Sequence, residues 1–164
     1  MTRPRSRYIP RRRVSLSTQR AHMVRRWPEF ACELRRGKLV CRGIVQPTQL
    51  SERYVTRIEM LDGDLPRIFV ESPNLEPRTG IQRIPHTYGP NRPCMYHPTE
   101  WSRDRILALT VVPWTYRWLY MYENWRVTGE WDAFGIHPRL DDDIRTTSRP
   151  RALPRAVRSS RRKR

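Results

Sequence analysis

One cysteine lies between two histidines in the middle of the chain, and these residues are the ones most able to do chemistry. Cys94 follows His86 by eight residues and precedes His97 by three. A thiol becomes a good nucleophile when a nearby cation or a helix N-terminus favours its thiolate form. Arg92, His97 and a helix expected shortly afterwards could each have this effect. A lone cysteine is more often a small buried apolar residue, so three interpretations stand: nucleophile, metal ligand or structural thiol.

A metal site is the weakest of these interpretations. Cys94 and His97 have the spacing of paired ligands and His86 could add a third, but a structural zinc site usually has a second paired motif. None is formed by the other candidate ligands, which are Cys32, Cys41 and His137. The sequence also lacks a Gly-rich phosphate loop, a nucleophile elbow and a His-Glu-x-x-His motif. We therefore expect no metal and no organic cofactor.

The other two cysteines are expected to be structural. Cys32 falls on a predicted helix and Cys41 in the middle of a predicted strand. Three cysteines, an odd number without regular spacing, argue against a disulfide scaffold. The first residues are basic, but no apolar signal-peptide core follows them, and no run approaches the roughly 20 apolar residues of a membrane span. The sequence thus favours a soluble cytoplasmic protein with reduced thiols.

The large positive charge belongs to the two ends of the chain. The formal net charge is +17, but residues 1–13 carry six Arg and residues 144–164 carry eight Arg and one Lys, with no acid in either segment. The stretch between them, residues 14–143, holds 18 basic and 16 acidic residues. Highly charged segments of this kind are typical of disordered extensions, which can bind phosphate without any fold. We expect a basic disordered arm (1–13), one folded domain (14–143) and a basic disordered tail (144–164).

Apolar periodicity predicts a helix from about Ser17 to Leu34, with Ser17 or Thr18 as its N-cap and a kink at Pro28. Gly37 would then end the helix. Three strand-like runs follow, each bounded by turn residues: Leu39 to Gln46, Tyr54 to Leu61 and Arg67 to Glu71. A helix followed by an antiparallel meander indicates the α+β class.

The second half of the chain combines a long loop with an aromatic helix. The stretch from Glu76 to Pro98 holds five prolines and two glycines, and a loop of this length in a compact domain is usually functional. Pro113 is expected to divide the helical region into Arg105–Val112 and Pro113–Val127, with Gly129 as the stop. The aromatic side chains of the second piece share one face and are expected to form core.

This order of elements resembles the ubiquitin-conjugating-enzyme fold, which has an N-terminal helix, an antiparallel meander, an active-site loop and, here, Trp-rich C-terminal helices. More specifically, it is similar to bacterial ubiquitin-conjugating-enzyme-like proteins of antiphage cyclic-oligonucleotide signalling operons (CBASS, type II short). The resemblance covers roughly residues 14–140. These motifs support it: Pro85-His86-Thr87-Tyr88, Pro93-Cys94-Met95-Tyr96, Glu100-Trp101, Pro113-Trp114, Trp118-Leu119, Tyr122-Glu123-x-Trp125, Thr128-Gly129-x-Trp131 and Gly135-x-His137.

The resemblance implies that Cys94 is a thioester-forming nucleophile. Its partner would be the C-terminus of a cGAS/DncV-like nucleotidyltransferase, which would be passed from Cys94 to an amine to prime antiphage defence. The eukaryotic family has an Asn ahead of the cysteine that helps to stabilise the oxyanion. His86 lies about where that Asn is expected, and could donate to the oxyanion or act as a general base. Asn91 is the rival donor, and packing of His86 against Tyr88 is the structural alternative.

Three further polar residues have roles that the sequence leaves open. His97 is expected to stabilise the thiolate or, alternatively, to cap the turn before Trp101. Glu123 lies in apolar surroundings and is expected to pair with an Arg rather than to act as an acid. His137 matches the family pattern and is expected to make a structural hydrogen bond.

A function from another class is also compatible with the sequence. The chain could be a non-catalytic binding module of the same fold, whose basic tails bind nucleic acid non-specifically or bind the synthase. Cys94 would then be dispensable and the tails essential, whereas an acyl transferase requires the thiol.

Overall fold

A short helix opens the part of the chain that the structure, a computed structural model, describes, which is residues 13–131. Helix α1, Leu16–Arg26, begins after Ser15, whose side chain accepts a hydrogen bond from the Thr18 N–H at 3.1 Å. The predicted cap at Ser17 or Thr18 is therefore wrong by two or three residues. The helix ends before Pro28, because proline disfavours helical geometry in the residue before it and cannot donate a backbone hydrogen bond.

Four antiparallel strands follow α1 and pair in chain order: β1 (Ala31–Arg35), β2 (Lys38–Val45), β3 (Tyr54–Leu61) and β4 (Arg67–Ser72). The last three confirm the predicted strands. Strand β1 replaces the second half of the predicted first helix, so the meander has four strands instead of three. Arg36 and Gly37 both have positive φ, 48° and 73°, as in a tight two-residue hairpin turn. Gly37 thus reverses a hairpin and does not end a helix.

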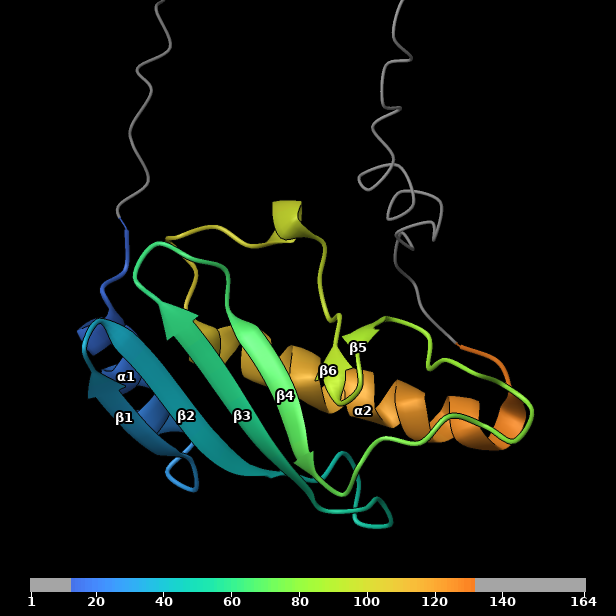
Figure 1. The fold of residues 1–164 in the computed structure, drawn as a ribbon. Coiled ribbons are helices and arrows are strands. Elements are labelled where there is room, and N and C mark those ends of the chain that lie inside the picture. Colours follow the sequence, from blue (N-terminus) through green and yellow to red (C-terminus); the bar gives the residue numbers. More distant parts are fainter. Residues whose placement is uncertain (1–12, 132–164) are drawn as a thin grey trace, which may run out of the picture.

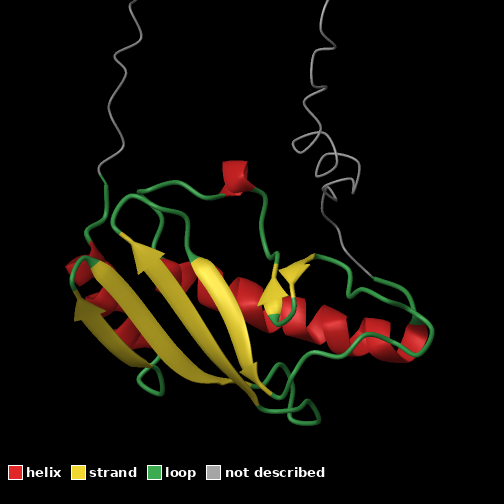
Figure 2. Cartoon of the chain, in the orientation of Figure 1, coloured by secondary structure: helices red, strands yellow, loops and turns green. Residues whose placement is uncertain are grey.

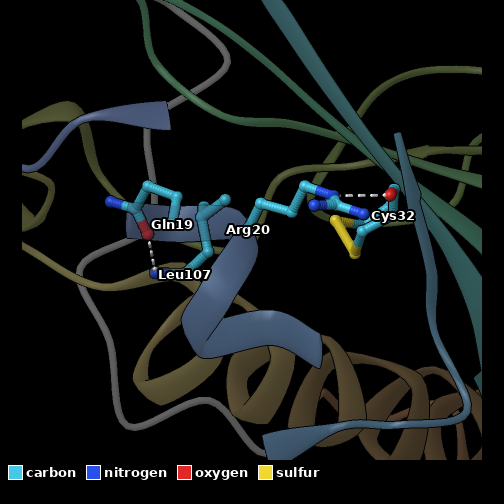
Figure 3. The surroundings of a disulfide bond; sticks show 5 residues. Gln19, Arg20, Cys32 and Leu107 are labelled. Carbon is cyan, nitrogen blue, oxygen red and sulfur yellow. Dashed lines mark hydrogen bonds between the residues drawn. A yellow bond between two sulfur atoms is a disulfide. The ribbon is translucent and has the colours of Figure 1, made fainter. Parts of the chain in front are cut away.

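The β1–β2 hairpin contains a disulfide that corrects the expectation of reduced thiols. Cys32 and Cys41 are direct partners in the antiparallel register, with Cα atoms 4.1 Å apart, and their sulfur atoms are bonded. Figure 3 shows the bridge close to α1, where Arg20 Nε donates to the Cys32 carbonyl at 3.0 Å. Both cysteines are structural, as expected, but Cys32 lies on a strand and not on a helix.

Both helices lie on one face of the sheet (Figures 1 and 2). The inner face of β2 and β3 buries alternate residues, as a half-buried sheet requires. At Gly43 a Cβ atom would lie 2.5 Å from the ring of Phe30, so this position on β2 admits only glycine while the ring is there. The outer face of the sheet carries Arg42, Arg57 and Glu71 together with apolar side chains such as Ile44 and Phe69.

The long helix α2, Val111–Thr128, runs behind the sheet and past β4 (Figure 1). Its buried face includes Trp118, Tyr122 and Trp125, which confirms the predicted aromatic core. The helix ends at Gly129, which has a φ of 87°, also as predicted. Pro113 lies in the first turn, where its missing N–H would have no helical partner.

The region before α2 is less helical than the sequence predicts. It contains two short 3₁₀ turns, η1 (Pro98–Glu100) and η2 (Leu107–Leu109), instead of a helix over Arg105–Val112. The buried side chain of Gln19 holds this region against α1. It donates to the Arg105 carbonyl at 2.7 Å, and it accepts from the Leu107 N–H at 2.9 Å (Figure 3).

The two basic end segments, residues 1–13 and 144–164, lie outside the described residues except for Arg13, and so does His137. Within residues 13–131, none of the helices combines the length and apolar character needed to cross a bilayer.

Candidate active site

A two-stranded hairpin places Cys94 opposite His86. Strands β5 (Thr87–Gly89) and β6 (Arg92–Pro93) are antiparallel, with Thr87 paired to Pro93. The chain reverses at Asn91, which has a φ of 56°, a conformation that asparagine tolerates better than most residues. The next pair outward is His86 and Cys94, and the Cys94 N–H donates to the His86 carbonyl at 2.7 Å.

Asn91 anchors this hairpin to the main sheet. Its backbone carbonyl accepts from the Val70 N–H of β4 at 2.9 Å. Its side-chain oxygen accepts from the Leu75 N–H at 2.7 Å, and its amide nitrogen donates to Asn74 Oδ1 at 2.8 Å. Because both ends of the Asn91 side chain are engaged, it has a structural role and is a poor donor for an oxyanion at Cys94.

Cys94 is the one cysteine of the three in the sequence that is outside the disulfide, and it is half-buried. Its two neighbours, Pro93 and Met95, line a cavity of about 340 Å³. The opposite wall of this cavity is the turn between β3 and β4, which includes Leu65 and Pro66. Cys94 itself is not among the residues that line it, so the cavity lies beside the segment that carries the thiol.

Tyr96 joins the two walls of this cavity. Its hydroxyl donates to the Pro66 carbonyl at 2.6 Å. Burial raises the pKa of Tyr96 well above its usual value, so the phenol stays protonated and keeps donating at neutral pH.

The imidazole of His86 packs against Trp131. The two ring centroids are 5.2 Å apart. Tyr88 is 58% exposed, and the Arg92 guanidinium lies over its ring at 5.1 Å. His86 itself has a φ of 52°, a left-handed backbone that is uncommon outside glycine. No pattern in the sequence indicates this contact, because Trp131 is 45 residues away from His86.

His97 caps the 3₁₀ turn η1. Its Nδ1 lies 2.8 Å from Thr99 Oγ1, and its backbone N–H donates to Glu100 Oε2 at 2.6 Å, so that the residues form a capping box. Of the two roles that the sequence left open for His97, the structure displays the cap before Trp101.

Glu123 corrects a further expectation, because its carboxylate forms no ion pair with an Arg of residues 13–131. Its carboxylate accepts from Ser51 Oγ at 2.6 Å, from the Glu52 N–H at 3.1 Å and from the Tyr54 hydroxyl at 2.9 Å. Burial, together with the hydrogen bond to Glu123, raises the pKa of Tyr54 far above its usual value. Glu123 thus fixes the β2–β3 loop on α2.

The remaining candidate chemistry was metal binding. Over residues 13–131 the structure contains no group of three or more His, Cys, Asp or Glu side chains that could hold a metal ion.

Comparison with known proteins gives the family. Residues 19–138, well over half of the chain, match the family model described as Type II CBASS E2 protein. The match includes the hairpin, Cys94 and the whole of α2. No curated protein matches the chain. The extent of the family match establishes that the chain belongs to the Type II CBASS E2 proteins, a family of CBASS antiphage defence.

Proposed function

We propose that the chain is a cysteine acyl transferase. It carries the C-terminal carboxyl group of the CBASS nucleotidyltransferase as a thioester on Cys94 and passes it to an amine. The observation on which this proposal depends is the 2.7 Å hydrogen bond from the Cys94 N–H to the His86 carbonyl. This hydrogen bond joins the main chain of Cys94, the one cysteine outside the disulfide, to the main chain of His86, the histidine predicted to assist the reaction. Family membership supports the CBASS context.

The reaction has two steps. The Cys94 thiolate attacks the carbonyl carbon of an activated carboxyl group, such as an acyl adenylate, and the activating group leaves with its bonding electrons. An amine then attacks the thioester carbon, the Cys94 thiolate leaves, and the amine nitrogen loses a proton as the amide forms. Each step passes through a tetrahedral oxyanion that needs a hydrogen-bond donor.

His86 is proposed to serve the second step, either as the donor to the oxyanion or as the base for the amine. Its neighbours supply a half-buried setting in which water competes less for such a hydrogen bond. His97 is proposed to hold the segment that carries Cys94 in position, through the cap that His97 makes with Glu100.

The direct test is covalent loading of the chain when it is co-purified with a CBASS nucleotidyltransferase. Intact-mass spectrometry should find an adduct that a thiol reductant removes from the wild-type chain. Cys94→Ala should abolish the adduct, and Cys94→Ser should replace it with an ester that resists the reductant. The double variant Cys32→Ala/Cys41→Ala is the matched control and should still load.

Two results would contradict the proposal. Loss of loading in the Cys32→Ala/Cys41→Ala variant, with its fold intact, would show that the adduct is not specific to Cys94. Defence that survives Cys94→Ala but is lost when residues 1–13 and 144–164 are deleted would instead assign a binding module.

A further inference from the structure

The carbonyl oxygen of His86 accepts two hydrogen bonds, and one of them comes from α2. Trp118 Nε1 donates to it at 3.1 Å, and the Cys94 N–H donates at 2.7 Å. Trp118 is only 4% exposed, so water is a poor substitute partner for its indole N–H. The buried indole of Trp118, on α2, is therefore hydrogen-bonded to the same His86 carbonyl that links the two proposed catalytic residues, His86 and Cys94.

A second indole contacts the imidazole itself. The chain turns at Gly129, and Trp131 then lies with its ring centroid 5.2 Å from that of His86 and 5.4 Å from that of Trp118. These separations are typical of favourable aromatic contacts. The two tryptophans thus contact different parts of His86: Trp118 binds its main chain, and Trp131 packs against its ring.

The backbone of His86 gives a reason for such support. At a φ of 52° a residue with a side chain is less stable than in the ordinary regions, and it stays there only if surrounding contacts hold it. The hydrogen bonds to its carbonyl oxygen are contacts of this kind. Without them the segment could relax, and the positions of His86 and Cys94 would change together.

We infer that Trp118 and Trp131 are positioning residues for acyl transfer, acting through His86. Trp118 fixes the main chain that His86 and Cys94 share, and Trp131 fixes the imidazole. The inference rests on the proposed function, because it requires that Cys94 carry an acyl group. Trp118 also stacks on Tyr122, with ring centroids 5.7 Å apart. The test must therefore separate positioning of His86 from packing alone.

The test uses the full chain and a small acyl probe, p-nitrophenyl acetate. The Cys94 thiolate attacks the ester carbonyl, p-nitrophenolate leaves and is measured by its absorbance, and acetyl-Cys94 remains. Excess lysine then attacks the thioester, which releases the thiolate, forms the amide and gives up one proton. Cys94→Ala supplies the blank for both steps.

Trp118→Phe keeps an aromatic ring on Tyr122 and removes the N–H donor. We expect it to slow discharge to lysine about tenfold, which corresponds to about 1.4 kcal/mol. A His86→Ala background keeps the main-chain carbonyl but removes the imidazole that Trp118 positions. There the same substitution should change the rate less than about twofold, because residues that act through one another are not additive. Trp131→Leu should behave in the same way. Trp114→Phe, one turn earlier on α2, is the matched control and should leave the rate unchanged.

The two possible failures are distinguishable. If Trp118→Phe slows discharge by the same factor with and without His86, or not at all, Trp118 does not position His86 and the inference is overturned. If the folded wild-type chain shows no acylation above the Cys94→Ala blank, the proposed function itself is overturned. Thermal unfolding of each variant confirms that the rates were measured on folded protein.

Discussion

His86 is the residue whose chemistry and conformation are most closely linked. Its left-handed backbone, with a φ of 52°, is tolerated by histidine and asparagine better than by most residues with a side chain. The same two residue types can donate a hydrogen bond to an oxyanion. An asparagine at this position would therefore keep both the conformation and a donor, while removing the basic imidazole.

We expect His86→Ala to slow transfer from Cys94 to lysine by about a hundredfold, the usual cost of losing an oxyanion donor or a general base. His86→Asn should recover part of that loss if His86 donates to the oxyanion. Single-turnover discharge of the acetyl thioester measures both. An equal loss in the two variants would assign His86 the role of base, and full activity in His86→Ala would remove it from the reaction.

The elements show which parts of the fold a single sequence can predict. Strands β2, β3 and β4 were found because turn residues bound each one, and α2 because its aromatic residues repeat with helical spacing. The periodicity predicts too long a first helix, because Phe30, Ala31 and Leu34 continue the helical spacing beyond Pro28. In the structure Phe30 precedes β1, and Ala31 and Leu34 belong to it. Tertiary packing, and not local propensity, determines the secondary structure of this segment.

The site could be predicted only where it is local in sequence. Cys94 and His86 are eight residues apart, so a hairpin between them was enough to bring them together. The hydrogen bond from Trp118 to His86 joins residues 32 positions apart, and no periodicity encodes it. The sequence does not predict the disulfide for a related reason: it places Cys32 on a helix, where Cys32 has no register opposite Cys41.

The contact between Gly43 and Phe30 makes a prediction at the level of the sheet. Gly43→Ala should lower the free energy of unfolding by about 1–3 kcal/mol, because the new Cβ must displace the ring. The measurement is urea-induced unfolding. Gly89→Ala is the matched control, since nothing lies within 4 Å of a Cβ built there. Equal stability of the two variants would show that Phe30 moves aside without cost.

At the scale of the whole molecule, some of the charges of residues 13–131 are paired on the sheet. On the outer face of the sheet, Glu71 accepts from Arg42 at 2.7 Å and from Arg57 at 2.6 Å. The hydrogen bond from Arg42, with a further one from Arg57, lowers the pKa of Glu71. Both pairs remain partly open to solvent, and pairs of this kind contribute little to stability.

The disulfide contributes more to the stability of the whole domain than these pairs. It closes a loop between cysteines nine residues apart, which on the chain-entropy account stabilises the fold by about 2–3 kcal/mol. We expect Cys32→Ala/Cys41→Ala to lose that amount in denaturant unfolding while Cys94 still reacts with p-nitrophenyl acetate. Unchanged stability would mean that the cysteines are reduced in the purified protein.

The bridge between β1 and β2 also affects how a thioester would be recognised in this protein. Dithiothreitol would release an acyl group from Cys94 and would also cleave the Cys32–Cys41 bond, so the chain would gain two hydrogens as the adduct left. Hydroxylamine attacks acyl carbonyls and spares sulfur–sulfur bonds. It is therefore the reagent that would report on the acyl linkage alone.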